Sequence, residues 1–314
     1  MRRQSAPHRQ HLQAGVSATM NEETLGFIGL GVMGEPMSGH LAEKSGRPVL
    51  AFDLVPAAIQ RWQDAGRKAA ASAAEVMTKA DIVFVSLPSG RHLEALCRGE
   101  DGLLAHAASG KVLVDLGTSP PSLSRALAAE FGEKGVAYAD APVARTRKAA
   151  EEGNLAITVG ATPELFARIE PLLSCFASDV THCGDVGSGQ IVKILNNMVV
   201  VGTVVALCEA ASIANASGME TQTLFEAFSK GSADSFALRA HGFNAVMPQS
   251  FPERVFSTEY MLKDVSYALE MGREAGLATK GASLGAELLG QAIDQGYGDQ
   301  YWPVILKIIG ERTS

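Results

Sequence analysis

The chain has 314 residues and a net charge of −7, with 46% apolar and 19% charged residues. A length above the roughly 250 to 300 residues at which single hydrophobic cores stop growing indicates two domains. The acidic balance argues against a nucleic-acid partner, and no uninterrupted apolar run reaches the roughly 18 residues that a membrane span needs. We therefore expect a globular protein that binds neither nucleic acid nor membrane.

The first 20 residues contain Arg2, Arg3 and Arg9 and no acidic residue. They lack the apolar core of a secretory signal, so we interpret residues 1–22 as a disordered tail. An organellar transit peptide, or a natural start at Met20, stays open as an alternative. The four cysteines have neither C-x-x-C nor metal-ligand spacing. This pattern favours free thiols in a reducing, cytoplasmic compartment and predicts no metal site.

Residues 25–28 predict a short buried strand, followed by a turn and a helix from about Met33. The turn has glycines in G-x-G-x-x-G spacing and comprises Gly29, Leu30, Gly31, Val32, Met33 and Gly34. In a dinucleotide-binding turn the first glycine permits the bend, the second leaves room for the pyrophosphate, and the third lets helix and strand pack closely. The free N–H groups of the helix then favour the anion. An ordinary βαβ unit is the alternative.

A second apolar strand, residues 48–52, ends in Asp53. This acidic residue follows the glycines by roughly 20 residues, the spacing at which a carboxylate accepts hydrogen bonds from an adenosine ribose. Asp53 is therefore a candidate cofactor ligand.

Strands and helices continue to alternate after Asp53. We expect helices at 56–65, up to 79 and up to 132, and strands at 68–70, 81–87, 111–115, 136–142 and 155–160. Continuous apolar runs of strand length are typical of parallel strands that are covered on both faces. The pattern predicts an α/β domain with a doubly wound parallel sheet over residues 23–185, with its ligands at the carboxyl ends of the strands.

The pattern changes after Gly184, where residues 186–217 contain no proline and predict one long helix. The helix is too apolar all round to be a surface helix, so we expect it to be buried between domains or between subunits. Residues 221–230, 260–275 and 281–295 predict further helices. Residues 186–314 should therefore form an all-α domain.

Lys193 and Asn197 are four residues apart on the long helix, so both project from one face. Burial would lower the pKa of this lysine toward the range in which it exchanges a proton at neutral pH. Asn197 would then orient a substrate hydroxyl. The alternative is that the lysine extends its amine to water.

Several motifs in the same order resemble the β-hydroxyacid dehydrogenase family, which includes 3-hydroxyisobutyrate dehydrogenase, tartronate semialdehyde reductase and, more distantly, 6-phosphogluconate dehydrogenase. They are Gly29-Leu30-Gly31-Val32-Met33-Gly34, Leu87-Pro88, Asp115-x-x-Thr118, Asp140-Ala141-Pro142-Val143, Gly153-Asn154-Leu155 and Gly189-x-x-x-Lys193-x-x-Asn196-Asn197. The resemblance spans Leu25 to about Ile309. It implies a Rossmann domain that binds NAD(P), a long connecting helix, an all-α C-terminal domain, and a homodimer or homotetramer.

The resemblance also implies roles for individual residues. Lys193 would be the general acid/base, and Asn196 and Asn197 would hold a small acidic aldehyde or its hydroxy acid. Leu87, Pro88 and Thr118 would line the nicotinamide, and Lys263 would close over the cofactor. Because Asp53 would repel a 2′-phosphate and no arginine follows it directly, we expect NAD rather than NADP.

Two motifs depart from the family pattern. Gly117 replaces the usual serine of D-x-S-T, and Ala144-Arg145-Thr146 replaces Ser-Gly-Gly after D-A-P-V. Arginine offers a planar fork of donors for a carboxylate, sulfonate or phosphate, and a similar Arg-Thr pair occurs in relatives that resemble sulfolactaldehyde reductases. We therefore expect Arg145 and Thr146 to bind the substrate anion. The alternative places Arg145 in a solvated basic run with Arg147 and Lys148.

The sequence thus predicts an NAD-dependent oxidoreductase that interconverts a small acidic aldehyde and a hydroxy acid of the 3-hydroxyisobutyrate, tartronate semialdehyde or 3-sulfolactaldehyde type. Two alternatives are an imine reductase and a non-catalytic dinucleotide-binding module that oligomerises. The retained Lys193 argues against both.

Overall fold

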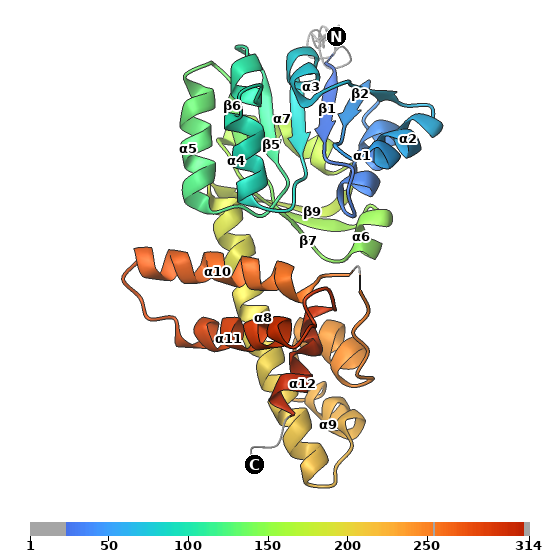
Figure 1. Ribbon diagram of the computed structural model, residues 1–314, viewed down its shortest axis with the longest axis vertical. Helices are drawn as coiled ribbons and strands as arrows, with labels where there is room; N and C mark the ends of the chain where they lie inside the picture. Colours follow the sequence, from blue (N-terminus) through green and yellow to red (C-terminus); the bar gives the residue numbers. More distant parts are fainter. Residues whose placement is uncertain (1–22, 254, 311–314) are drawn as a thin grey trace, which may run out of the picture.

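The computed structural model describes residues 23–253 and 255–310, which form two stacked parts (Figure 1). The upper part is a sheet with helices on both faces, and the lower part is helical. The long helix α8 (Ser188–Ala216) runs from the sheet through the centre of the helical part. The tail that we expected at residues 1–22 lies outside the described residues.

Nine strands of the described chain form one sheet. They are β1 (Leu25–Ile28), β2 (Val49–Phe52), β3 (Lys68–Ala69), β4 (Ile82–Val85), β5 (Val112–Asp115), β6 (Ala137–Asp140), β7 (Val143–Ala144), β8 (Leu155–Gly160) and β9 (Ala177–Gly184). Their order is β3-β2-β1-β4-β5-β6-β8-β7, and β9 pairs with β8. The pairs from β3 to β6 are parallel, which confirms the predicted doubly wound sheet.

The far end of the sheet differs from the prediction. Strand β8 runs antiparallel to β6 and β7, and β9, which the sequence did not predict, pairs with β8 in parallel. Most residues of β9 are only partly covered, and its sequence ASDVTHCG mixes polar and apolar side chains. It therefore lacks the continuous apolar run that marks a buried parallel strand.

Helices cover both faces of the sheet. They are α1 (Gly34–Lys44), α2 (Pro56–Asp64), α3 (Ala73–Lys79), α4 (Gly90–Arg98), the 3₁₀ turn η1 (Leu103–His106), α5 (Pro121–Gly132), α6 (Arg147–Glu151) and α7 (Pro163–Leu173). Side chains of β4 alternate between two cores, because successive residues of a strand point to opposite faces. Ile82 and Phe84 pack in one core, and Val83 and Val85 pack in the other.

The helical part confirms the all-α prediction. It contains α8, α9 (Thr221–Phe228), the π-helix η2 (Leu238–Val246), α10 (Thr258–Glu274), α11 (Lys280–Asp294), the 3₁₀ turn η3 (Trp302–Ile305) and α12 (Leu306–Ile309). A third core forms where one side of α8 meets α10 and α11, and it includes Val201, Leu207, Val265 and Leu289.

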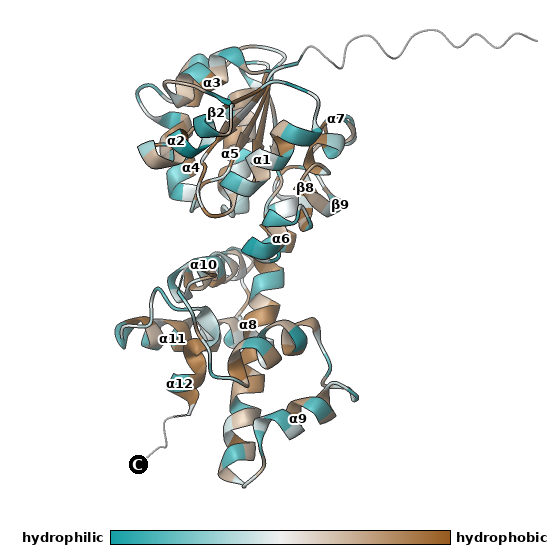
Figure 2. Ribbon diagram, turned by 90° about the vertical axis from the view of Figure 1, so that its right-hand side faces the viewer, coloured by the Kyte–Doolittle hydropathy of each residue, from teal (hydrophilic) through white to brown (hydrophobic). Residues whose placement is uncertain are grey.

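Helix α8 is long and apolar enough to cross a membrane by length and composition, which corrects our expectation that no segment would be. Its apolar run is interrupted by polar residues such as Lys193, and for that reason the sequence count missed it. The core helix of a soluble protein has the same properties, and α8 packs in the core of the helical part. Figure 2 shows the apolar residues of α8 running through this part.

Candidate active site

The glycine-rich turn between β1 and α1 has the shape that a dinucleotide needs. Gly29 has φ of 96°, and a Cβ there would lie 2.2 Å from the Ser86 carbonyl oxygen. A Cβ on Gly34 would lie 1.9 Å from the Gly29 carbonyl oxygen, so α1 packs tightly on the turn. Gly31 faces open space, with nothing within 4 Å of a Cβ at that position. The turn therefore has room for a pyrophosphate at the helix N-terminus.

Asp53 lies beside this turn, at the carboxyl end of β2. Its Oδ2 accepts a 2.5 Å hydrogen bond from the Leu30 amide, and its Oδ1 accepts one of 2.7 Å from the Val55 amide. The carboxylate is thus fixed against the glycine turn, where an adenosine ribose would lie in a fold of this type.

An ion pair borders the same turn. Arg61 on α2 donates to both carboxylate oxygens of Glu35 on α1, over 2.8 and 2.9 Å. The Glu35 hydrogen bond raises the pKa of Arg61, and the charge of Asp53 raises it further. Arg61 therefore lies near Asp53 but is already paired with another carboxylate of the chain.

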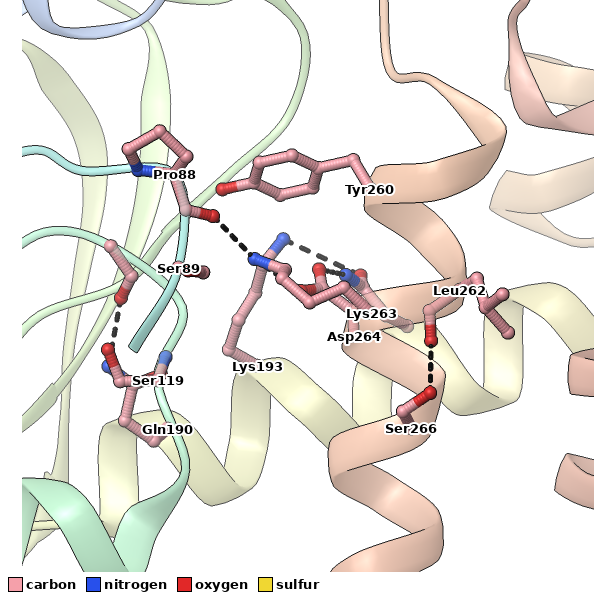
Figure 3. A network of polar contacts seen from close by, with 12 residues as sticks. Pro88, Ser89, Ser119, Gln190, Lys193, Tyr260, Leu262, Lys263, Asp264 and Ser266 are labelled. Carbon is pink, nitrogen blue, oxygen red and sulfur yellow. Dashed lines mark hydrogen bonds and ion pairs between the residues drawn. The ribbon is translucent and has the colours of Figure 1, made fainter. Parts of the chain in front are cut away.

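Lys193 lies at the junction of the two parts, where α8 leaves the sheet (Figure 3). Its Nζ lies 3.5 Å from Asn197 Oδ1, and Asn196 Nδ2 donates to the same oxygen over 3.2 Å. Asn197 Nδ2 donates to Asp264 Oδ2 on α10 over 2.7 Å. Because Nδ2 is committed to Asp264, the carbonyl oxygen of Asn197 is the atom that faces the amine.

Lys263 approaches the same carboxylate from α10. Its Nζ lies 3.1 Å from Asp264 Oδ1 and donates to the Pro88 carbonyl oxygen over 2.9 Å (Figure 3). The amine also lies 3.7 Å from the centre of the Tyr260 ring. Lys263 therefore joins the helical part to the loop that follows β4.

Burial lowers the pKa of both amines, those of Lys193 and Lys263. It lowers the pKa of Lys193 from that of a free lysine, while the nearby Asp264 charge raises it and Lys263 lowers it further. Burial likewise lowers the pKa of Lys263, with Asp264 acting in the opposite direction. Lys193 as a residue is half-buried, and desolvation is the largest cause of the lowered pKa of its amine.

The carboxyl ends of β5 and β6 hold the first turn of α8. Asp140 accepts hydrogen bonds from the Gly187 amide over 2.6 Å and the Gln190 amide over 2.8 Å. Gln190 Nε2 donates to Asp115 Oδ2 and to the Gly117 carbonyl oxygen, over 3.2 and 2.8 Å. Burial raises the pKa of Asp115 to about 7 and that of Asp140 to about 6.

The expected nicotinamide-lining residues lie around this junction. Thr118 is buried between Gly117, which bonds Gln190, and Ser119, whose amide donates to Gln190 Oε1 over 3.0 Å. Leu87 and Pro88 follow β4, where Leu87 is half-buried and Pro88 is exposed. A Cβ on Gly117 would lie 3.0 Å from the Leu87 carbonyl oxygen, so the serine of the family pattern would need small adjustments here.

The hydrogen-bond partners of the Arg145 side chain do not include Lys193, Asn196 or Asn197. It has φ of 83°, and its guanidinium donates to Asn154, to Ser178 Oγ and to Asp179 Oδ2 at 2.6 Å. Its side chain therefore ties β7 to β8 and β9. Thr146 Oγ1 accepts from the Ala149 amide and caps α6. These contacts bring neither residue to Lys193 or Asn197, so a role in anion binding stays a prediction.

Sequence reasoning assigned no role to three polar side chains of this site, although Asp115 stood in a quoted motif: Asp115, Gln190 and Asp264, each at most 1% exposed. Asp264 did carry a signal, because it occupies an apolar stripe of α10 with Met261, Val265 and Ala268. A carboxylate on such a stripe needs a buried partner. Among the described residues, no group of His, Cys, Asp and Glu is arranged to hold a metal ion.

The comparisons with known proteins cover both parts of the chain. Residues 24–184 match the family described as the NAD binding domain of 6-phosphogluconate dehydrogenase. Residues 187–308 match the family described as "NAD-binding of NADP-dependent 3-hydroxyisobutyrate dehydrogenase". Together with the glycine turn, these matches define a nicotinamide-dinucleotide oxidoreductase.

The relatives and solved structures that the chain matches include named dehydrogenases. The chain is 34% identical to 2-(hydroxymethyl)glutarate dehydrogenase of Eubacterium barkeri, over 92% of this chain and 95% of that protein. It is 32% identical to the NAD-dependent L-serine dehydrogenase of Pseudomonas aeruginosa, over 90% and 97%. The Mycobacterium tuberculosis 3-hydroxyisobutyrate dehydrogenase structure with L-serine matches with a TM-score of 0.83 at 29% identity, over 92% of this chain and 100% of that one.

The chain therefore belongs to the β-hydroxyacid dehydrogenase family. This confirms the family resemblance, the NAD(P)-binding domain and a dehydrogenase that acts on the CH–OH group of hydroxy acids. An imine reductase from Pseudomonas sp. matches with a TM-score of 0.60 at 17% identity, which shows a shared fold alone.

Proposed function

We propose that this dehydrogenase interconverts a small acidic aldehyde and its hydroxy acid, with Lys193 as the general acid/base. One observation supports the proposal above the others: the half-buried Lys193 amine faces the carbonyl oxygen of Asn197, whose amide group is held by Asp264. Burial lowers the pKa of this amine and so makes its neutral form more accessible, as a group that gives and takes a proton in acid-base catalysis requires.

The bound nicotinamide supplies or accepts the hydride. In reduction, the Lys193 ammonium donates a proton to the carbonyl oxygen of the aldehyde. In oxidation, the neutral amine accepts the proton of the substrate hydroxyl. Asn196 Nδ2 would donate to the substrate oxygen beside the amine, and Asn197 Oδ1 would accept from the substrate hydroxyl. Lys263, which bonds the Pro88 carbonyl, would keep the helical part closed against the nicotinamide loop.

For the substrate anion we propose Thr118, Arg145 and Thr146. The candidate substrates are those of the relatives or of similar size: 3-hydroxyisobutyrate, L-serine, tartronate semialdehyde and 3-sulfolactaldehyde. Arg145 is paired with Asp179. It would have to exchange this partner, or share its five donors, to bind a carboxylate or sulfonate.

The test of the proton role replaces Lys193 by alanine. We expect kcat to fall about 10²- to 10⁴-fold, the usual contribution of a positioned acid/base, while NADH binding measured by fluorescence changes little. Lys79→Ala is the matched control, since Lys79 lies on α3 and pairs with Glu75. Full activity of the Lys193 variant would refute the role.

The test of the substrate is a panel of these four compounds and an uncharged aldehyde of similar size, for the native chain and for Arg145→Ala. The hydroxy acids are tested with NAD and NADP, and the aldehydes with NADH and NADPH. A loss of kcat/KM in the variant that is confined to sulfonated or carboxylated substrates would support anion binding by Arg145. Equal rates with uncharged aldehydes would contradict the acidic substrate class.

The two alternatives make different predictions. An imine reductase would turn over cyclic imines faster than aldehydes, and a non-catalytic module would bind NADH without oxidising it. The proton-donating position of Lys193 beside Asn197 favours carbonyl chemistry over both.

We also propose a cytoplasmic protein of two domains, residues 23–185 and 186–314, that assembles as a homodimer or homotetramer. One stripe of α8 is exposed although it is apolar, and it contains Val192, Leu195, Val199 and Ile213. A second copy of the chain would cover this stripe. Light scattering of the native chain and of Val199→Glu would test the assembly: the native chain should exceed the monomer mass, and the variant should approach it.

A further inference from the structure

The first turn of α8 is anchored more firmly than a helix start requires. Two neighbouring strands of the sheet each contribute a buried carboxylate: Asp140 from β6 binds backbone amides, and Asp115 from β5 binds the Gln190 side chain. A Cβ on Gly189 would lie 2.4 Å from the Thr158 carbonyl oxygen, so the helix also packs directly against β8. Asp140 accepts only from backbone amides at the helix start, so the contacts of the Gln190 side chain are a second, separate anchor.

Gln190 uses its whole amide group on one loop. Its Nε2 donates to Asp115 Oδ2 and to the Gly117 carbonyl oxygen, and its Oε1 accepts from the Ser119 amide. Ser119 Oγ donates to the same Asp115 oxygen over 3.0 Å, which closes the network (Figure 3 shows Ser119 and Gln190). The side chain of Gln190 is fully buried, so these bonds are not exchanged with water.

This network joins the two halves of the proposed site. Thr118 lies between the two loop residues that Gln190 binds, and Lys193 lies three residues further along α8 than Gln190. We propose that Gln190 is a positioning residue that fixes the Lys193 amine relative to the Gly117–Ser119 loop through these three hydrogen bonds. The inference rests on the proposed function of Lys193, and Asp115 takes part by holding both the loop and the glutamine.

The effect of losing this anchor follows from the geometry. Without the amide, the Asp115 carboxylate and the Gly117 carbonyl lose a buried donor, and α8 can shift or rotate at its start. A misplacement of about 1 Å can cost a factor of about 100 in rate. The expected pyrophosphate and ribose contacts lie at the glycine turn and at Asp53, whose carboxylate bonds the Leu30 and Val55 amides rather than Gln190. NADH affinity should therefore change little.

The experiment compares Gln190→Met, an uncharged side chain of similar length, with Lys193→Ala and with the double variant. Single-turnover rates and NADH affinity are measured for all three and for the native enzyme. We expect Gln190→Met to lower the rate about 10- to 100-fold while NADH affinity stays within about threefold. When Gln190→Met is added to Lys193→Ala, the single-turnover rate should fall less than about twofold further, because Gln190 acts through the Lys193 amine.

Other outcomes overturn the inference in distinguishable ways. Equal losses in the presence and absence of Lys193 would show that Gln190 supports the site by itself. A parallel loss of NADH affinity would assign it to cofactor binding. If Gln190→Met does not fold, Ser119→Ala removes one bond of the network and should give a smaller loss with the same dependence on Lys193. Full activity of Lys193→Ala would refute the proposed function instead.

Discussion

Asn197 on α8 and Asp264 on α10 join the two helices through a 2.7 Å hydrogen bond between Nδ2 and Oδ2. Both side chains are almost completely buried, at 4% and 0% exposed. The bond fixes the orientation of the Asn197 amide and places a carboxylate close to two amines, those of Lys193 and Lys263. Asp264 is therefore the residue through which the pKa of Lys193 can be changed without touching the amine.

We expect Asp264→Asn to shift the pH dependence of oxidation to lower pH. The Asp264 charge raises the pKa of Lys193, so its removal lowers that pKa further. Oxidation requires the neutral amine, so its rate rises as pH increases through the Lys193 pKa. The rising limb of the profile should therefore move to lower pH, because an amine that loses a nearby opposite charge gives up its proton more readily. The measurement is kcat against pH.

Asp294→Asn is the matched control, because Asp294 ends α11 and is exposed. If the rising part of the kcat–pH profile is the same in Asp264→Asn as in the native enzyme, a group other than Lys193 sets the pH dependence of oxidation. A shift to higher pH would contradict the sign of the electrostatic argument.

Patterns along the chain predicted the features that depend on neighbours in sequence. The strand at residues 82–85 follows from a continuous apolar run, and the shared face of Lys193 and Asn197 follows from their spacing. The partners of the site residues depend instead on tertiary contacts. Asn197 and Asp264 are 67 residues apart, and Gln190 and Asp115 are 75 apart. Periodicity carries no information about such pairs.

Asp53→Asn should increase the use of NADP. The native carboxylate is fixed beside the Leu30 amide and would repel a 2′-phosphate. Asparagine keeps one oxygen that can accept a bond from that amide and removes the charge. We expect the ratio of kcat/KM for NADP to that for NAD to rise about tenfold or more, which corresponds to about 1.4 kcal/mol.

Glu35→Gln added to this variant should raise the ratio further. Arg61 is held by two bonds to Glu35, and loss of the charged partner frees the guanidinium for a phosphate near Asp53. A double variant with the same ratio as Asp53→Asn would show that Arg61 does not reach the 2′ position.

Asp115→Asn should remove part of the pH dependence of stability. Burial raises the pKa of Asp115 to about 7, above its ordinary value of 3.8. The folded chain then binds this proton more tightly than the unfolded chain, so the free energy of unfolding falls as pH rises from about 4 to 7. The shift sets an upper limit of about 4 kcal/mol for this loss.

Urea unfolding at pH 5 and pH 8 measures this difference. The native chain should lose stability between the two values, and Asp115→Asn should lose less. Asp140 contributes in the same direction, because its pKa is raised to about 6, so a smaller slope will persist. Identical slopes for both proteins would mean that Asp115 ionises normally in the folded chain.

Arg145 combines a strained backbone with a well-bonded side chain. Its φ of 83° lies in the left-handed region that favours glycine, and its guanidinium bonds Asn154, Ser178 and Asp179. Both Arg145→Ala and Arg145→Gly remove these hydrogen bonds. Alanine keeps the unfavourable backbone conformation at this position, whereas glycine adopts it without strain. We therefore expect Arg145→Gly to be more stable than Arg145→Ala by about 1 kcal/mol in urea unfolding.

The same pair of variants separates anion binding from the structural role of Arg145. If the guanidinium binds the substrate anion, both variants should raise KM for an acidic substrate equally, about 10-fold or more, since neither carries the charge. If Arg145 only ties β7 to β8 and β9, KM should follow stability, and the glycine variant should be closer to the native enzyme. Gln249→Gly and Gln249→Ala provide the control for strain elsewhere, because Gln249 has φ of 49°.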